Sequence, residues 1–165
     1  MTAATEVTPA TEPVISITRL FDAPRELVFD AWTHPQHISQ WWGPRGFTTT
    51  THERDVRPGG VWRFIMHGPD GTDYDNRIVF REVVRPERLV YDHDSDKEND
   101  PDGFHVTVTF AEEDSKTRLT LRTLFKSIAE RDRKIEFGAV AGGNQTLDRL
   151  GAFLKGETSF KGEKS

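Results

Sequence analysis

The spacing of hydrophobic residues changes along the chain and predicts the order of its secondary-structure elements. The β-branched run VISITRLF, residues 14–21, predicts a first strand. Residues 22–33 then place apolar side chains at helical spacing, and residues 34–42, HPQHISQWW, predict a second short helix. Gly43 and Pro44 end that helix, so two tryptophans stand directly before a turn.

From Phe47 onward, apolar and polar residues alternate, which is typical of strands with one buried face. In residues 61–67, VWRFIMH, the side chains of Trp62, Phe64 and Met66 share one face. About six such runs follow one another, separated by turn sequences such as RPGG and GPDGT. Short turns between successive strands predict an antiparallel meander.

The last predicted element is a long helix over residues 130–154 with one apolar face. That face comprises Phe137, Val140, Asn144, Leu147, Gly151 and Leu154. Gly142 and Gly143 lie inside this helix, where each glycine costs about 1 kcal/mol relative to alanine. We therefore expect them to permit close packing, a bend or a space for another molecule.

An antiparallel sheet with one long helix buries its inner face against that helix. We therefore expect an α+β helix-grip fold: a curved antiparallel sheet of about six to seven strands around the C-terminal helix, with two short helices after the first strand. The length of 165 residues suits one domain, which we assign to residues 14–155. Residues 1–13, rich in Thr, Ala, Pro and Glu, are expected to be a disordered tail, and residues 156–165 a flexible one.

Composition excludes several classes of function. The net charge of −5 argues against nucleic-acid binding, which needs a basic surface. The absence of cysteine excludes disulfides, thiolate catalysis and cysteine-ligated zinc, and it fits a reducing cytoplasm. No apolar run approaches the roughly 20 residues of a membrane-spanning helix, and the first residues lack the pattern of a secretory signal. We therefore expect a cytoplasmic protein with no nucleic-acid partner and no membrane insertion.

Five segments resemble a known family: FDAPRELVFDAWTHPQHISQWWGP, ERDVRPGGVWRFIMHGPDGT, EVVRPERLVY, VTVTFAEEDSKTRLTL and QTLDRLGAFL. They are similar to bacterial single-domain proteins related to the activator of the heat-shock-protein-90 ATPase, in the START-like (SRPBCC) superfamily of hydrophobic-ligand binders. The resemblance extends from about Val14 to Leu154, and DVRPGGVWRFIMHGPDG is its most specific part. It implies a helix-grip fold with a deep, mostly apolar cavity. It implies much less about chemistry, because the superfamily includes lipid carriers, cyclases, oxygenase domains and co-chaperone domains.

Two features depart from the family pattern. Related sequences often carry an aromatic residue where this chain has Gly143, so glycine here leaves space inside the grip or lets the helix approach the sheet. The segment DHDSDKENDPDG, residues 92–103, is unusually acidic and could reshape the entrance of a cavity.

Candidate metal and catalytic motifs find little support. Asp92, Asp94 and Asp96 have the spacing of a calcium-binding EF-hand loop, but Lys97 and Gly103 stand where such a loop needs glycine and glutamate. The six histidines show no metal-binding spacing, and no serine lies in a nucleophile motif. We therefore predict no metal, no cofactor and no assigned catalytic residue.

Aromatic residues on separate elements would meet inside a helix-grip fold, where they either fill the core or, as the resemblance implies, line a ligand cavity. The candidate cavity residues are Trp41, Trp42, Phe47, Trp62, Phe64, Met66, Tyr74, Tyr91, His93, Phe104, Phe137, Val140, Gly143, Asn144 and Leu147. Because adjacent helical residues point about 100° apart, one residue of the Trp41–Trp42 pair is expected inside the grip and the other at its border. His93 and Asn144 are the favoured polar groups inside, whereas alternation turns Arg63 outward.

The leading interpretation is a binding protein for a small apolar or amphipathic molecule held between the sheet and the C-terminal helix. One alternative is a cyclase- or hydrolase-like enzyme acting on an aromatic or polyketide-type compound, which would need His93, Tyr91 and Asn144 to converge. Another is a chaperone ATPase-activator-like accessory protein. Eukaryotic co-chaperones carry an additional N-terminal domain that the short tail before Val14 cannot supply, so we expect no chaperone partner. Exposed aromatics near the helix–strand junction could mediate a homodimer.

Overall fold

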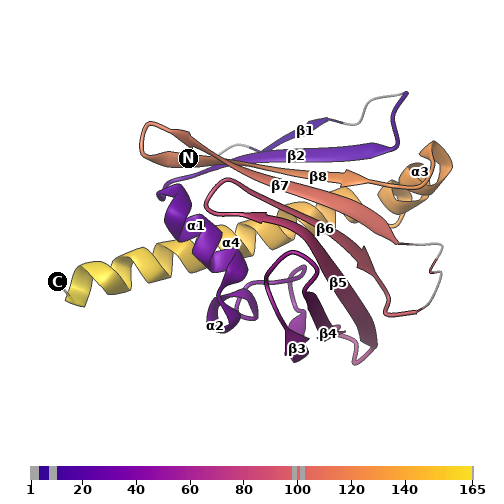
Figure 1. The fold of residues 1–165 in the computed structure, drawn as a ribbon, viewed down its shortest axis with the longest axis horizontal. Helices are drawn as coiled ribbons and strands as arrows, with labels where there is room; N and C mark the ends of the chain where they lie inside the picture. The colour runs from indigo at the N-terminus through magenta and orange to yellow at the C-terminus, as the bar shows by residue number, and fades with distance from the viewer. Residues whose placement is uncertain (1–3, 8–10, 98–99, 101–102, 165) are drawn as a thin grey trace.

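The chain folds into a curved antiparallel sheet that wraps around one long helix (Figure 1). The structure is a computed structural model, and it describes residues 4–7, 11–97, 100 and 103–164. Within these residues the strands are β1 (Ala4–Val7), β2 (Val14–Phe21), β3 (Thr48–Arg54), β4 (Val61–His67), β5 (Asp73–Val84), β6 (Arg88–Asp94), β7 (Phe104–Glu113) and β8 (Lys116–Leu124). The helices are α1 (Arg25–Thr33), α2 (Pro35–Ile38), α3 (Ile128–Glu136) and α4 (Ala139–Lys164).

The strand order in the sheet is β1-β2-β8-β7-β6-β5-β4-β3, and every pair of neighbours is antiparallel. The strands from β3 to β8 form the predicted meander, because each pairs with the next one along the chain. In Figure 1, α3 lies at one end of α4, while α1 and α2 lie toward the C-terminal half of that helix. This arrangement confirms the α+β helix-grip fold predicted from the sequence.

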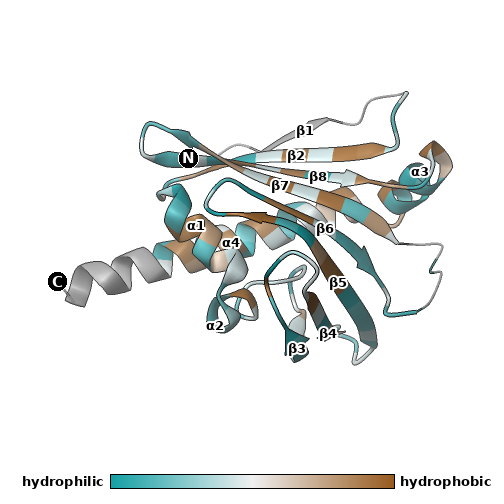
Figure 2. Cartoon of the chain, viewed as in Figure 1, coloured by the Kyte–Doolittle hydropathy of each residue, from teal (hydrophilic) through white to brown (hydrophobic). Residues whose placement is uncertain are grey.

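Alternation along the strands creates the inner face of the sheet. Trp62 pairs with Ile78, Ile78 with His93, and His93 with Phe104, so these four side chains form one row across β4 to β7. Figure 2 shows the resulting alternation of hydrophobic and hydrophilic residues along the strands. This inner face is the concave side of the sheet, and it is buried against α4.

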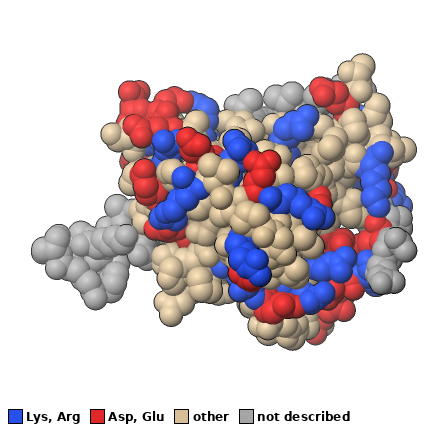
Figure 3. All heavy atoms as spheres, in the orientation of Figure 1, with Lys and Arg blue, Asp and Glu red and all other residues tan. Residues whose placement is uncertain are grey.

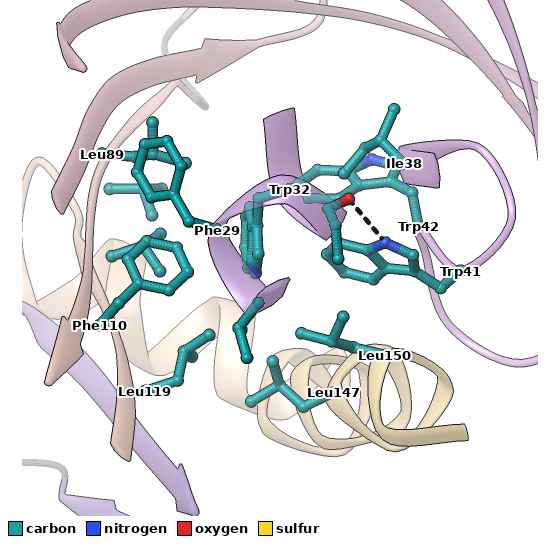
Figure 4. Close-up of a cluster of buried hydrophobic side chains, with 14 of the residues drawn as sticks. Phe29, Trp32, Ile38, Trp41, Trp42, Leu89, Phe110, Leu119, Leu147 and Leu150 are labelled. Carbon is teal, nitrogen blue, oxygen red and sulfur yellow. Dashed lines mark hydrogen bonds between the residues drawn. The ribbon is translucent and has the colours of Figure 1, made fainter. Parts of the chain in front are cut away.

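A cluster of buried aromatic side chains lies where α1 and α2 meet α4 and the sheet (Figure 4). Trp32 stands between Phe29 on one side and the pair Trp41 and Trp42 on the other (Figure 4). The ring centroid of Trp32 lies 5.0 Å from that of Trp41, in an edge-to-face contact. The indole Nε1 of Trp41 donates a hydrogen bond of 3.0 Å to the carbonyl oxygen of Ala31, which satisfies the polar atom of this fully buried ring.

A buried arginine joins α4 to β2. Arg19 points inward from β2 and is only 7% exposed. Its guanidinium donates to Oδ1 of Asp148 at 2.8 Å and to Oδ1 of Asn144 at 3.0 Å. Since an unpaired buried charge is costly, this contact fixes the position of α4 relative to the sheet.

Three features differ from the expectations drawn from the sequence. Residues 4–7, assigned to an N-terminal tail, form β1 and pair with β2; residues 1–3 and 8–10 lie outside the described residues. The predicted helix over 130–154 is two helices, because Gly138 adopts a φ of 91° that glycine tolerates and other residues rarely do. The second of these, α4, continues to Lys164 through the segment expected to be a flexible tail.

The described surface carries mixed charge. Figure 3 shows basic and acidic side chains interspersed on the face in view. On the outer face of the sheet, Arg77 pairs with Asp94 at 2.7 Å and Arg81 with Asp92 at 2.7 Å. None of the helices in the described part of the chain has the length and apolar character needed to cross a bilayer.

A candidate ligand cavity between the sheet and α4

A cavity of about 380 Å³ lies between the inner faces of β6, β7 and β8 and the first turns of α4. The junction between α3 and α4 forms one part of its wall, and the loop at Gly43 and Pro44 forms another. Hydrocarbon groups make up most of the lining. The volume is near the small end of the range of about 300–1,000 Å³ that is typical of ligand pockets.

The structure brings about half of the candidate cavity residues together. Those in the wall are Trp42, Met66, Tyr91, His93, Phe104, Phe137, Gly143 and Leu147. The structure places the others outside it: Trp41, Phe47, Trp62, Phe64, Tyr74, Val140 and Asn144.

Each residue outside the wall is held elsewhere for a physical reason. Trp62 and Phe64 stack on each other, with centroids 4.0 Å apart, and both are covered by Trp42. Phe47 packs beside Tyr74, which is 47% exposed on β5. Val140 packs partly buried against the hydrophobic core, in the first turn of α4.

Asn144 is one of the two polar groups expected inside the grip, and the structure gives it a different role. Its Oδ1 accepts from Arg19 and its Nδ2 donates to the carbonyl oxygen of Val140 at 3.0 Å. Asn144 therefore anchors α4 and does not face the cavity. Arg63, expected on the outer face, pairs there with Glu53 and Asp96.

The adjacent tryptophans separate as predicted, but not within a helix: the helix expected over residues 34–42 ends at Ile38, and both tryptophans lie in the turn that follows α2. Trp41 is fully buried beneath α1, where its indole bonds Ala31, and it is not part of the wall. Trp42 is 8% exposed and lines the cavity. The pair therefore places one ring in the core and one ring on the border of the open space.

A hydrogen bond to Asn76 fixes the tautomer of His93 and leaves Nδ1 as an acceptor. The Nδ2 of Asn76 donates to the carbonyl oxygen of Tyr74 at 2.9 Å, so its Oδ1 faces Nε2 of His93, 2.8 Å away. Because Oδ1 can only accept, Nε2 carries the proton and Nδ1 keeps a lone pair. Burial lowers the pKa of His93 to about 4, although nearby Asp94 raises it. The imidazole is therefore uncharged at neutral pH.

The cavity wall offers few other polar groups. The hydroxyl of Tyr91 and the hydroxyl of Thr123 have no hydrogen-bond partner among the described residues, and both residues are part of the wall. Burial raises the pKa of Tyr91, so its hydroxyl stays protonated. Thr146 is already satisfied, because its Oγ1 donates to the carbonyl oxygen of Gly142 at 2.9 Å. Lys134, on α3, lies 3.8 Å from Oε2 of Glu130.

The two mid-helix glycines have different surroundings. A Cβ on Gly143 would lie 2.9 Å from Cδ1 of Ile17, so glycine lets α4 approach β2 closely. A Cβ on Gly142 would meet only Pro44, at 3.6 Å, which is an ordinary contact. Gly142 therefore leaves room on the cavity side of the helix, and Gly143 permits close packing.

Sequence reasoning missed part of the wall. The missed residues are Trp32, Gly43, Pro44, Val106, Leu121, Thr123, Lys134, Gly138, Ala139, Gly142 and Thr146. Strand alternation could have identified Val106, Leu121 and Thr123, which lie on the same face of the sheet as Tyr91. Gly138 was a signal for the break between α3 and α4, which brings Lys134 to the cavity and leaves Phe137 82% exposed at its edge.

The other clusters considered in the sequence are engaged elsewhere. Asp92 pairs with Arg81 and His105, and Asp94 pairs with Arg77, so arginines occupy these acidic groups of the 92–103 segment. Residues 98–99 and 101–102 of this segment lie outside the described residues. No cluster of three or more metal-binding side chains occurs in the described part of the chain.

Solved structures with the same fold come from several bacteria. The crystal structure of protein Ms6760 from Mycobacterium smegmatis has a TM-score of 0.82 and 24% identity, over 92% of this chain and 97% of that one. The solution structure of a protein from Arthrobacter aurescens has a TM-score of 0.85 and 25% identity, over 92% and 91%. Protein NE0264 from Nitrosomonas europaea has a TM-score of 0.82 and 24% identity, over 92% and 99%.

The search of curated proteins found no match. A family model does match: the one described as activator of Hsp90 ATPase homolog 1-like protein, which aligns with residues 22–155. This range covers α1 to most of α4 and includes every element that forms the cavity wall. The chain therefore belongs to the activator of Hsp90 ATPase homolog 1-like family.

Proposed function

We propose that this protein binds a small apolar or amphipathic molecule in the cavity between the sheet and α4. The observation that carries the proposal is the cavity of about 380 Å³, which hydrocarbon groups line and Gly142 helps to keep open. Empty apolar cavities forfeit packing contacts, so a molecule of matching shape gains them on entry. The few polar groups in the wall would orient it.

Titration of the purified protein with fatty acids and polycyclic aromatic compounds tests this proposal. Trp32 and Trp42 line the cavity, so an entering ligand should change tryptophan fluorescence in a saturable way. Gly142→Phe should fill the cavity and weaken binding at least tenfold. Gly156→Phe is the matched control, because a side chain at that position of α4 meets nothing within 4 Å. Equal weakening by both variants, or saturable binding by neither the wild type nor the control, would contradict the proposal.

The enzyme alternative required His93, Tyr91 and Asn144 to face one space. His93 and Tyr91 do line the cavity, but Asn144 lies outside its wall and bonds Arg19. That three-residue arrangement is therefore wrong, and we propose no catalytic residue.

We also propose that the protein works in the cytoplasm, in keeping with the absence of cysteine from its 165 residues. The chaperone alternative rests on the family name alone. A pull-down with the chaperone, followed by an ATPase assay, tests it; binding with stimulated ATPase activity would favour that role over the one proposed.

A further inference from the structure

We propose that the cavity selects neutral ligands that carry a hydroxyl donor on an apolar frame, and that Nδ1 of His93 is the group that accepts this donor. The ligand class is thus an alcohol or a phenol, in preference to a carboxylate or a plain hydrocarbon. This inference rests on the proposed binding function and adds the chemistry of the ligand to it.

The tautomer of His93 decides the direction of the hydrogen bond that its free nitrogen can make. The carbonyl oxygen of Tyr74 orients the side-chain amide of Asn76, and that amide fixes the proton of His93 on Nε2. A rotated amide would place two oxygens, Asn76 Oδ1 and Tyr74 O, against each other. The free nitrogen of the ring is therefore an acceptor, and it requires a donor from the ligand.

Aromatic rings form the environment of the His93 imidazole. The rings of Phe104, Phe64 and Trp42 surround His93, with centroids 4.8, 5.9 and 6.5 Å from it. Nδ1 has no hydrogen-bond partner among the described residues, and His93 is part of the cavity wall. Water is a poor competitor inside an apolar wall, and a lone pair without a donor is costly there. A ligand hydroxyl removes that cost.

Tyr91 supplies a second polar group next to His93. Tyr91 and His93 lie two residues apart on β6, so their side chains project from the same face, about 7 Å apart along the strand. The Tyr91 hydroxyl has no partner among the described residues and can both donate and accept. It can therefore contact the same ligand hydroxyl or a second polar atom.

The polar wall disfavours an anionic ligand. A neutral imidazole lone pair repels a carboxylate, and a protonated acid would lose its proton at neutral pH in water before entry. Lys134 is the cationic side chain among the described lining residues, and Glu130 already lies 3.8 Å from its Nζ. An anion would therefore compete with a carboxylate that the protein supplies.

Four probes with one ring frame test the inference: 2-naphthol, 2-methoxynaphthalene, naphthalene and 2-naphthoate. Their affinities are measured by calorimetry, and amide chemical shifts in two-dimensional NMR locate the site. We expect 2-naphthol to bind about tenfold more tightly than the methyl ether and the hydrocarbon, which corresponds to one hydrogen bond to a buried acceptor. We expect 2-naphthoate to bind most weakly.

Amino-acid substitutions test whether His93 causes the preference for a ligand hydroxyl. His93→Phe should abolish the preference for 2-naphthol while naphthalene binds as before, and Tyr91→Phe should reduce it. His52→Phe is the matched control, since His52 is exposed on β3 and lies outside the cavity wall; it should keep the full preference. If His93→Phe does not fold, the nitrogen chemical shift of Nδ1 is measured in the wild type with and without 2-naphthol. A change in this shift on binding would report the hydrogen bond between the ligand hydroxyl and Nδ1.

The outcomes separate the two proposals. Equal affinity for 2-naphthol and its methyl ether, with shifts at the cavity, would overturn the hydroxyl preference and leave the binding function standing. Tighter binding of 2-naphthoate would overturn it as well and would point to Lys134. Absence of shifts at the cavity with all four probes would count against the binding function itself.

Discussion

Nη1 of Arg149, on α4, lies 2.9 Å from the carbonyl oxygen of Gly43, in the loop that forms one edge of the cavity. The same nitrogen also lies 3.0–3.1 Å from the carbonyl oxygens of Trp42, Pro44 and Phe47, and its two hydrogens are shared among the four oxygens. One side chain of α4 therefore contacts four backbone carbonyl oxygens of the loop. The position of this edge therefore depends on a contact with α4, whose first turns form another part of the cavity wall.

Arg149→Met should release the loop. Several carbonyls would lose their charged donor at once, and we expect a loss of about 2–3 kcal/mol in the free energy of unfolding. Amide hydrogen exchange should accelerate over residues 42–47. Arg45→Met is the control, because Arg45 is exposed and pairs with Asp148 at the surface; it should cost less than about 1 kcal/mol. Similar losses for both variants would show that the four carbonyls do not depend on Arg149.

Asn144→Ala separates anchoring from ligand contact. It removes one acceptor from the buried guanidinium of Arg19, so we expect urea unfolding to show a loss of about 1–2 kcal/mol. Probe affinity should stay within twofold of the wild type, because Asn144 lies outside the cavity wall. A large loss of affinity with little loss of stability would instead place Asn144 at the ligand.

Alanine at the two glycines should change the free energy of unfolding differently. Gly142→Ala gains helix propensity and makes an ordinary contact with Pro44, so it should stabilise the protein by about 0.5–1 kcal/mol. Gly143→Ala gains the same propensity but brings its Cβ within 2.9 Å of Cδ1 of Ile17, which must move. We expect Gly143→Ala to be neutral or destabilising.

A double-mutant cycle identifies the cause of that difference. Ile17→Val removes the Cδ1 atom that a new Cβ would meet, so Gly143→Ala should be more favourable in the Ile17→Val background than in the wild type. Additive effects of the two substitutions would show that Ile17 does not limit the approach of α4.

The neutrality of His93 predicts a pH dependence of stability. The folded-state pKa is about 4, whereas histidine in an unfolded chain titrates near 6.5. Between these values the unfolded chain binds the additional proton, so stability falls as the pH decreases from about 6.5 to about 4. The loss attributable to this residue reaches about 3 kcal/mol.

His93→Gln should flatten the curve of unfolding free energy against pH across this window, because glutamine does not titrate. His52→Gln, at an exposed position of β3, is the control and should leave the slope of the wild type. Parallel curves for the wild type and His93→Gln would show that the folded protein protonates His93 as readily as the unfolded chain.

Sequence periodicity was sufficient to predict the fold. Alternation placed Trp62 and Phe64 on the inner face, and the spacing of Leu147 and Leu154 identified the face of α4 that is buried. These local patterns are sufficient because they reflect which side of each element faces water.

The candidate site was harder to predict, since a shared inner face does not tell which side chains fill the core and which border a space. Trp62 and Phe64 share the face of Met66, yet they stack on each other while Met66 reaches the cavity. The role of Asn144 depends on Arg19, which is 125 residues away in the sequence. No local pattern reveals such a partner.

The cavity wall has a consequence for how its ligand can be found. Its residues come from α1, β4, β6, β7, β8, α3 and α4, and from the loops at residues 42–44 and 137–138, so no single segment contains it. A molecule that fits it therefore binds the folded chain and not the unfolded one. By mass action, such a molecule at one hundred times its dissociation constant adds about 2.7 kcal/mol to the stability of the whole domain. A rise in the melting temperature of the unlabelled protein therefore detects binding of such a ligand, whatever its chemical class.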